Sequence, residues 1–239
     1  MKPNFRNISP YIYLPALSAL LLGLSRLPLH LGFLVLFAFL PLLNLLAKPA
    51  TKKQLLLAGF SFSAVYALVS LHWLTLVTPG GYVGIFPLFT VYFFLLFFLV
   101  NRCSKKFNIY LTFPVFWLSL EYLQTLGEFR FPWFNAAYSL VDYNFLLQPA
   151  EIGGVYFVSL IILVINIVIH NIFRGNRRSY FTLLAIAIVW VGYGVIRLST
   201  LDVEDTGKKV ALVQVSVPGK KMGQSLSRYH LEQLSHLHL

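Results

Sequence analysis

The stretch Tyr82–Asn101, YVGIFPLFTVYFFLLFFLVN, contains no charged side chain over its full length. A helix needs about 20 apolar residues to span the hydrocarbon layer of a bilayer. Pro87 would interrupt a helix in water, but neighbouring helices can satisfy the freed backbone groups in a membrane. The stretch therefore predicts a transmembrane helix.

The rest of the chain has the same character. Hydrophobic residues make up 58% of the 239 residues and charged residues 11%, which is more apolar than a soluble domain of this size. Seven apolar stretches approach the spanning length, at residues 8–25, 27–47, 54–77, 82–101, 107–126, 150–172 and 180–198. We therefore predict an all-α polytopic membrane bundle of about seven transmembrane helices over residues 1–200. The first two stretches are separated only by Ser25–Pro28, so a hairpin of short helices is an alternative.

Basic residues alternate between the predicted loops and so orient the bundle. They cluster before the first stretch and in every second loop after it, at Lys2, Arg6, Lys48, Lys52, Lys53, Arg102, Lys105, Lys106, Arg174, Arg177 and Arg178. The intervening loops hold only Arg26 and Arg130. Basic loops stay on the cytoplasmic side, so we expect a cytoplasmic N-terminus and a periplasmic C-terminal segment in a bacterial inner membrane. The net charge of +11 follows from this topology and does not indicate a nucleic-acid partner.

Cofactor chemistry has no signal in the sequence. The single cysteine, Cys103, excludes an internal disulfide and a cysteine-rich metal site. It stands beside Arg102 and Lys105, at the predicted cytoplasmic face. We expect neither a metal nor an organic cofactor.

The longest predicted connection, Gly127–Pro149, is rich in aromatic residues and lies on the periplasmic side. Long loops in compact proteins are usually functional or disordered, and this one is too aromatic to be disordered. One interpretation is an aromatic belt that anchors the bundle at the interface. The other is that Trp133 and Tyr138 shape the entrance of a lipid cavity.

An ionisable side chain, Glu121, lies just before this loop in the outer third of the predicted fifth helix. Such a group faces the bundle interior by default, and Arg130 is its expected partner unless Arg130 instead faces a lipid phosphate. His72 and Trp73 are expected to join this polar cluster. Glu121, Arg130, Trp133 and Tyr138 are therefore the candidate substrate-binding residues, and a purely structural hydrogen-bond network around Glu121 is the alternative.

Polar and small residues elsewhere have simpler interpretations. Asn166 and His170 lie towards the cytoplasmic side, where we expect them to pack or cap helices. Gly153 and Gly154 predict close helix packing, because they lack the strand and the third glycine of a dinucleotide-binding loop.

The segment Lys208–Pro218, KKVALVQVSVP, alternates like a strand that enters a soluble domain. It completes an ordered series with Phe131-Pro132-Trp133, Tyr138-Ser139 and the helix start Gly153–Ser159. From about residue 10 to 235 this series resembles the bacterial apolipoprotein N-acyltransferases. The resemblance implies that residues 207–239 are the first strand and helix of a truncated periplasmic α/β nitrilase-like domain.

The same resemblance implies the reaction. The family transfers an acyl chain from a phospholipid donor to the N-terminal diacylglyceryl-cysteine of a diacylated lipoprotein acceptor, through a Glu-Lys-Cys set. All three groups would lie downstream of Leu239, so we expect no catalytic residue in this chain and no activity from it alone. A catalytically inactive shortened paralogue, a small transporter and an envelope scaffold are the alternatives.

Overall fold

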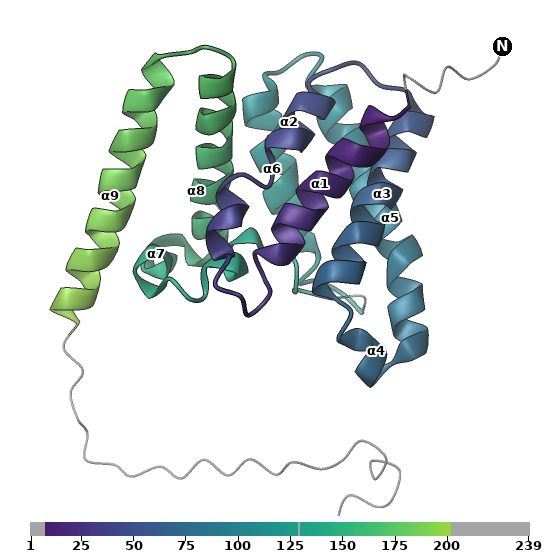
Figure 1. Ribbon diagram of the computed structural model, residues 1–239, viewed down its shortest axis with the longest axis horizontal. Helices are drawn as coiled ribbons and strands as arrows, with labels where there is room; N and C mark the ends of the chain where they lie inside the picture. The colour runs from purple at the N-terminus through teal and green to yellow at the C-terminus, as the bar shows by residue number, and fades with distance from the viewer. Residues whose placement is uncertain (1–7, 129, 202–239) are drawn as a thin grey trace, which may run out of the picture. The chain divides into compact units, whose positions relative to one another are not determined.

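The computed structural model describes residues 8–128 and 130–201, and within these ranges the chain is helical and has no strand. The elements are α1 (Pro10–Leu24), η2 (Gly32–Leu36), α2 (Leu40–Leu46), α3 (Lys52–Ser70), α4 (Leu74–Val77), α5 (Pro79–Cys103), α6 (Ile109–Leu123), η3 (Ala136–Leu140), α7 (Asn144–Leu147), α8 (Ala150–Phe173) and α9 (Arg178–Thr200) (Figure 1). The all-α class is confirmed for these residues. The predicted nitrilase-like segment, 207–239, lies outside them.

Four helices, α3, α5, α8 and α9, are long and apolar enough to cross a membrane. Three of the seven predicted spans correspond to shorter apolar helical segments, namely α1, Gly32–Leu46 and α6. α1 and α6 have 15 residues each, which gives them a rise of about 22 Å against a hydrocarbon thickness of about 30 Å. The membrane character is thus confirmed, whereas seven crossings remain a prediction.

The second predicted span is interrupted between η2 and α2. Pro41, near the start of α2, has no N–H to donate, and its ring excludes a helical carbonyl one turn earlier. Asn166 of α8 satisfies buried backbone groups at the break: its Oδ1 accepts from Phe39 N at 2.9 Å, and its Nδ2 donates to Val35 O at 3.0 Å. The expected packing and capping role of Asn166 is confirmed, and it is what makes a broken helix tolerable here.

The ends of the bundle differ in composition. One end, which we call the basic end, carries the connections α2–α3, α5–α6 and α8–α9, and with them Lys48–Lys53, Arg102–Lys106 and Arg174–Arg178 (Figure 1). Hydrogen bonds join its helices, including Asn101 Nδ2 to Leu46 O at 3.0 Å and Tyr110 Oη with His170 Nδ1 at 3.1 Å. The opposite end, which we call the loop end, carries residues 25–31, 124–128 and 130–149.

The core is a cluster of aromatic rings between α3, α5 and α6. Phe62, Phe93 and Trp117 are buried there, and ring centroids of Phe62 and Phe93 lie 4.4 Å apart. Gly59 lets α3 approach α5 closely, because a Cβ at this position would lie 2.7 Å from Phe94 N. The close approach brings the cluster together next to the loop end.

Gly153 and Gly154 do not pack helices together as predicted. Both are exposed, and they form a kink near the start of α8, where Gly154 has φ 68° and ψ −169°. This region of backbone space is essentially restricted to glycine. The pair therefore redirects the chain as it leaves the loop end, and the prediction failed because sequence spacing does not reveal a positive φ.

Candidate functional site

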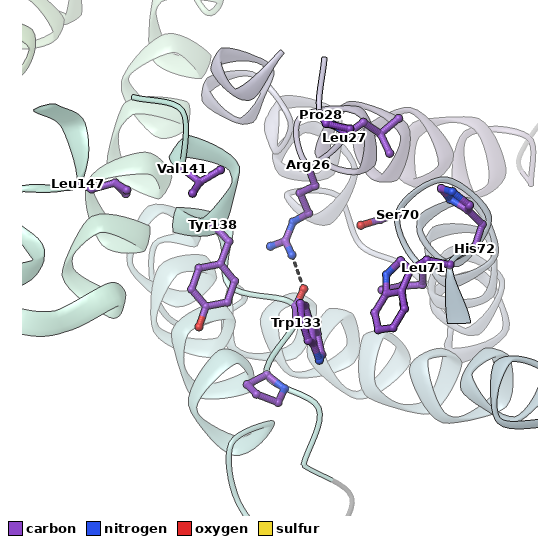
Figure 2. A pocket seen from close by; sticks show the side chains of 12 residues that line it. Arg26, Leu27, Pro28, Ser70, Leu71, His72, Trp133, Tyr138, Val141 and Leu147 are labelled. Atoms are coloured by element: carbon purple, nitrogen blue, oxygen red, sulfur yellow. Dashed lines mark hydrogen bonds between the residues drawn. The ribbon is translucent and has the colours of Figure 1, made fainter. Parts of the chain in front are cut away.

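A cavity of about 710 Å³ opens at the loop end. Its lining comes from three parts of the chain: the turn after α1, the end of α3 with the residues before α4, and the segment 132–147 (Figure 2). These residues are Arg26, Leu27, Pro28, Ser70, Leu71, His72, Trp73, Pro132, Trp133, Tyr138, Val141 and Leu147. The surface they present is mainly apolar, with one permanently charged group, Arg26.

Phe134 anchors the segment that forms one wall of the cavity. Its side chain is fully buried in the aromatic core, with ring centroids 5.0 Å from Phe93 and 5.0 Å from Trp117. An aromatic loop residue thus packs like a core residue. The loop is not simply a belt at the membrane surface, because it folds back into the bundle.

Glu121 holds Asn135 and Ala136, the next residues of the segment 132–147, in place. Its buried Oε1 accepts hydrogen bonds from Trp117 Nε1 at 2.9 Å and from Ala136 N, the first residue of η3, at 2.8 Å. Asn135 Nδ2 lies 3.4 Å from the other carboxylate oxygen. The carboxylate therefore joins α6 to the start of η3, where unpaired backbone N–H groups need an acceptor.

Arg26 holds the segment from the other side. Its guanidinium donates to the main-chain oxygens of Trp133 and Asn135, and its Cζ lies 5.7 Å from the centroid of the Tyr66 ring. In Figure 2 the side chain projects between Tyr138 and Trp133 towards the Trp133 carbonyl. Among the described residues Arg26 forms no ion pair with a carboxylate. Its positive charge thus lies at the cavity wall.

Two predicted residues, Trp133 and Tyr138, do line the cavity. Their side chains are 54% and 46% exposed, so large parts of both rings remain open to a ligand. Trp133 also packs against Trp73, with ring centroids 5.4 Å apart. His72 and Trp73 lie in the same lining, as expected from their position, although neither hydrogen bonds to Glu121 in the part of the chain that the structure describes.

The other two predicted residues occupy different places. Glu121 is buried beneath the segment, and Arg130 is exposed and outside the lining. The expected Glu121–Arg130 ion pair is not formed in the described ranges, because the Glu121 carboxylate is directed at Trp117 and Ala136 instead. Arg26 is the basic residue at the cavity. The sequence did carry a signal for it, since Arg26 and Arg130 are the only basic residues in the loops of that side.

The arrangement suits binding of an amphipathic molecule with an anionic group. Aromatic and aliphatic surfaces accommodate apolar chains, while an arginine attracts phosphate or carboxylate. Within residues 8–128 and 130–201, no group of three or more His, Cys, Asp or Glu side chains is placed to hold a metal ion. Cys103, the last residue of α5, lies at the basic end, across the bundle from the cavity.

Comparisons with known proteins point to one family. Residues 18–168, which include every residue of the cavity lining, match the family model described as apolipoprotein N-acyltransferase N-terminal domain. An apolipoprotein N-acyltransferase of Geobacter metallireducens is 31% identical over 90% of this chain and 45% of its own length. Those of Rickettsia typhi and Chlorobaculum tepidum are 29% and 26% identical, over 67% and 89% of this chain and 35% and 42% of their own lengths. The chain thus spans less than half the length of these curated relatives.

Proposed function

The chain belongs to the apolipoprotein N-acyltransferase family, and we propose that it is the membrane part of an enzyme that acylates lipoproteins. In this proposal the donor is a phospholipid and the acceptor is the N-terminal diacylglyceryl-cysteine of a diacylated lipoprotein. The cavity at the loop end is their entrance. The single observation that supports this most strongly is that Arg26, Trp133 and Tyr138 meet in one largely apolar cavity.

The depth at which the two substrates must react explains why their entrance is placed at the loop end. Both substrates are anchored by acyl chains, so the donor ester and the acceptor amine must meet at headgroup level while the chains stay in apolar surroundings. The described residues offer a cation beside exposed aromatic rings in this cavity. We assign Arg26 to attract the lipid phosphate, and Trp133 and Tyr138 to contact the glycerol region and the upper acyl chain.

Glu121 has a supporting role in this assignment. It contacts the segment through Ala136 N and lies outside the cavity lining, so it acts as a positioning residue for Trp133 and Tyr138. Arg130, which is exposed nearby, is proposed to meet a lipid phosphate before the lipid enters. The family resemblance implies that a Glu-Lys-Cys set transfers the acyl group. We assign that step to groups outside the described residues.

The finer topology is also part of the proposal. We propose seven crossings, with the basic end in the cytoplasm, the loop end in the periplasm and residues 207–239 forming the start of a nitrilase-like domain. The shorter segments α1, Gly32–Leu46 and α6 would then cross within a locally thinned bilayer or with flanking residues inside the interface.

A matched pair of variants tests the entrance. In a complete enzyme that carries this membrane part, Trp133→Ala should lower kcat/KM for acyl transfer by about tenfold, because it removes an aromatic contact with the substrate. Tyr122→Ala is the control, since Tyr122 is also 54% exposed but lies on α6 outside the cavity lining. Equal rates for both variants and the parent would overturn the assignment, provided that both remain inserted and folded.

A further inference from the structure

A second cavity, of about 260 Å³, forms a groove between α5 and α6. Leu95 and Leu99 of α5 and Leu123 of α6 line it and are partly open to the outside of the bundle. Along α5 the groove extends from Tyr92 to Leu99, which is about 10 Å of helix. It has no residue in common with the cavity at the loop end.

Gln124 closes the end of this groove that lies nearest the loop end. Its side chain is only 3% exposed, yet among residues 8–128 and 130–201 neither its amide oxygen nor its amide nitrogen has a hydrogen-bond partner. A buried polar group without a partner destabilises the fold. An amide that lines an apolar groove and lacks both an acceptor and a donor indicates a ligand that supplies both.

The chemistry of membrane lipids narrows the ligand. In the glycerol region a diacyl phospholipid offers two ester carbonyls, which only accept hydrogen bonds. A monoacyl phospholipid offers one ester carbonyl and one hydroxyl, so it can accept from Gln124 Nε2 and donate to Gln124 Oε1. A groove between two helices that is lined mainly by leucines of both also suits one acyl chain.

We propose that this groove binds one monoacyl glycerophospholipid, with the acyl chain along α5 and α6 and the glycerol hydroxyl and ester at the Gln124 amide. The choice of ligand rests on the proposed function. When an amine takes an acyl group from a diacyl phospholipid, the ester C–O bond breaks, an amide C–N bond forms, and the proton that the amine nitrogen loses goes to the lipid oxygen, which becomes a hydroxyl. The reaction therefore produces this lipid, and the groove is a route by which it leaves.

Photolabelling of the full chain in lipid nanodiscs tests the proposal. The probes are a monoacyl glycerophosphoethanolamine with a diazirine in its acyl chain and the diacyl lipid with the same labelled chain. We expect the monoacyl probe to label peptides of α5 and α6 that line the groove. Gln124→Leu should reduce this labelling by about tenfold, which corresponds to the loss of hydrogen bonds worth about 1.4 kcal/mol.

Two further variants keep the test decisive. Thr125→Val is the matched control, because the Thr125 hydroxyl, in the turn after α6, donates to Tyr122 O at the end of that helix and lies outside the groove lining, so this variant should label like the parent. Leu99→Trp fills the far end of the groove without touching the amide and should also abolish labelling. Equal labelling of parent and Gln124→Leu, or equal labelling by the monoacyl and diacyl probes, would overturn the proposal. This readout requires no acyl transfer, so it stands or fails separately from the Trp133 experiment.

Discussion

Replacement of Glu121 tests whether this buried carboxylate supports the cavity wall or takes part in chemistry. Glu121→Ala removes the acceptor for Trp117 Nε1 and Ala136 N, both of which are in hydrogen bonds shorter than 3.0 Å. Each buried donor left without a partner costs about 1–3 kcal/mol, so the two together should cost about 4 kcal/mol. For a chain of this size we expect a melting temperature roughly 8–15 °C lower.

Glu121→Gln should be tolerated for a reason that the structure supplies. The amide oxygen of glutamine can take the place of Oε1 and keep both short hydrogen bonds. Its NH₂ group would then face Asn135, whose Oδ1 has no hydrogen-bond partner among the described residues. Rotation of the Asn135 amide by half a turn lets that oxygen accept from the glutamine. We expect a cost below about 1 kcal/mol.

Intrinsic-fluorescence melting of the purified chain in detergent measures both variants against the parent. If Glu121→Gln destabilises as much as Glu121→Ala, the negative charge itself is needed and the acceptor argument is wrong. If instead Glu121→Gln melts like the parent but abolishes acyl transfer in a complete enzyme, Glu121 takes part in the reaction and is not merely a positioning residue.

Three other predictions concern the fold and its orientation. A periplasm-active reporter should be silent when fused after Lys106 or Arg178 and active when fused near Asp142 or Asp205, and the reverse pattern would contradict the proposed topology. Gly154→Ala should lower the free energy of unfolding by about 1–3 kcal/mol, because Gly154 has a positive φ. Gly84→Ala in α5 should be neutral or slightly stabilising, because a Cβ at Gly84 would have no neighbour within 4 Å. Equal melting temperatures of the two variants would contradict the strain argument. Asn166→Leu should lower the melting temperature by several degrees, because it removes the acceptor of Phe39 N and the shorter of two hydrogen bonds to Val35 O beside the break before α2; an unchanged melting curve would show that water replaces the amide.

Much of the fold could be predicted from the sequence because apolar length and charge distribution are recorded directly in it. The stretch around Tyr82–Asn101 is indeed a long apolar helix, α5. The predicted basic loops gather at one end of the bundle. Helix breaks were harder to predict: Pro41 marks the interruption before α2, but nothing local shows that Asn166, more than a hundred residues later, makes it tolerable.

Several residues of the cavity lining could be predicted from the sequence, but the contacts that hold the cavity wall together could not. Trp133, Tyr138, His72 and Trp73 were identified from their position and lie in one cavity. From the sequence, Arg130 is the cation expected to pair with Glu121. The folded chain instead brings Arg26 to the main chain of Trp133 and Asn135, over a separation of more than a hundred residues. Long-range contacts of this kind leave no local pattern.

The central claim, that the cavity at the loop end admits the lipid substrates, is tested most directly by site-specific crosslinking. A photoreactive phenylalanine analogue placed at Tyr138, inside the cavity lining, is compared with the same group at Tyr122, which is exposed on α6 outside that lining. With a labelled diacylated lipopeptide in the membrane, the account predicts a strong adduct at position 138 and little at position 122. Equal adducts at both positions, or an adduct at position 122 alone, would contradict it.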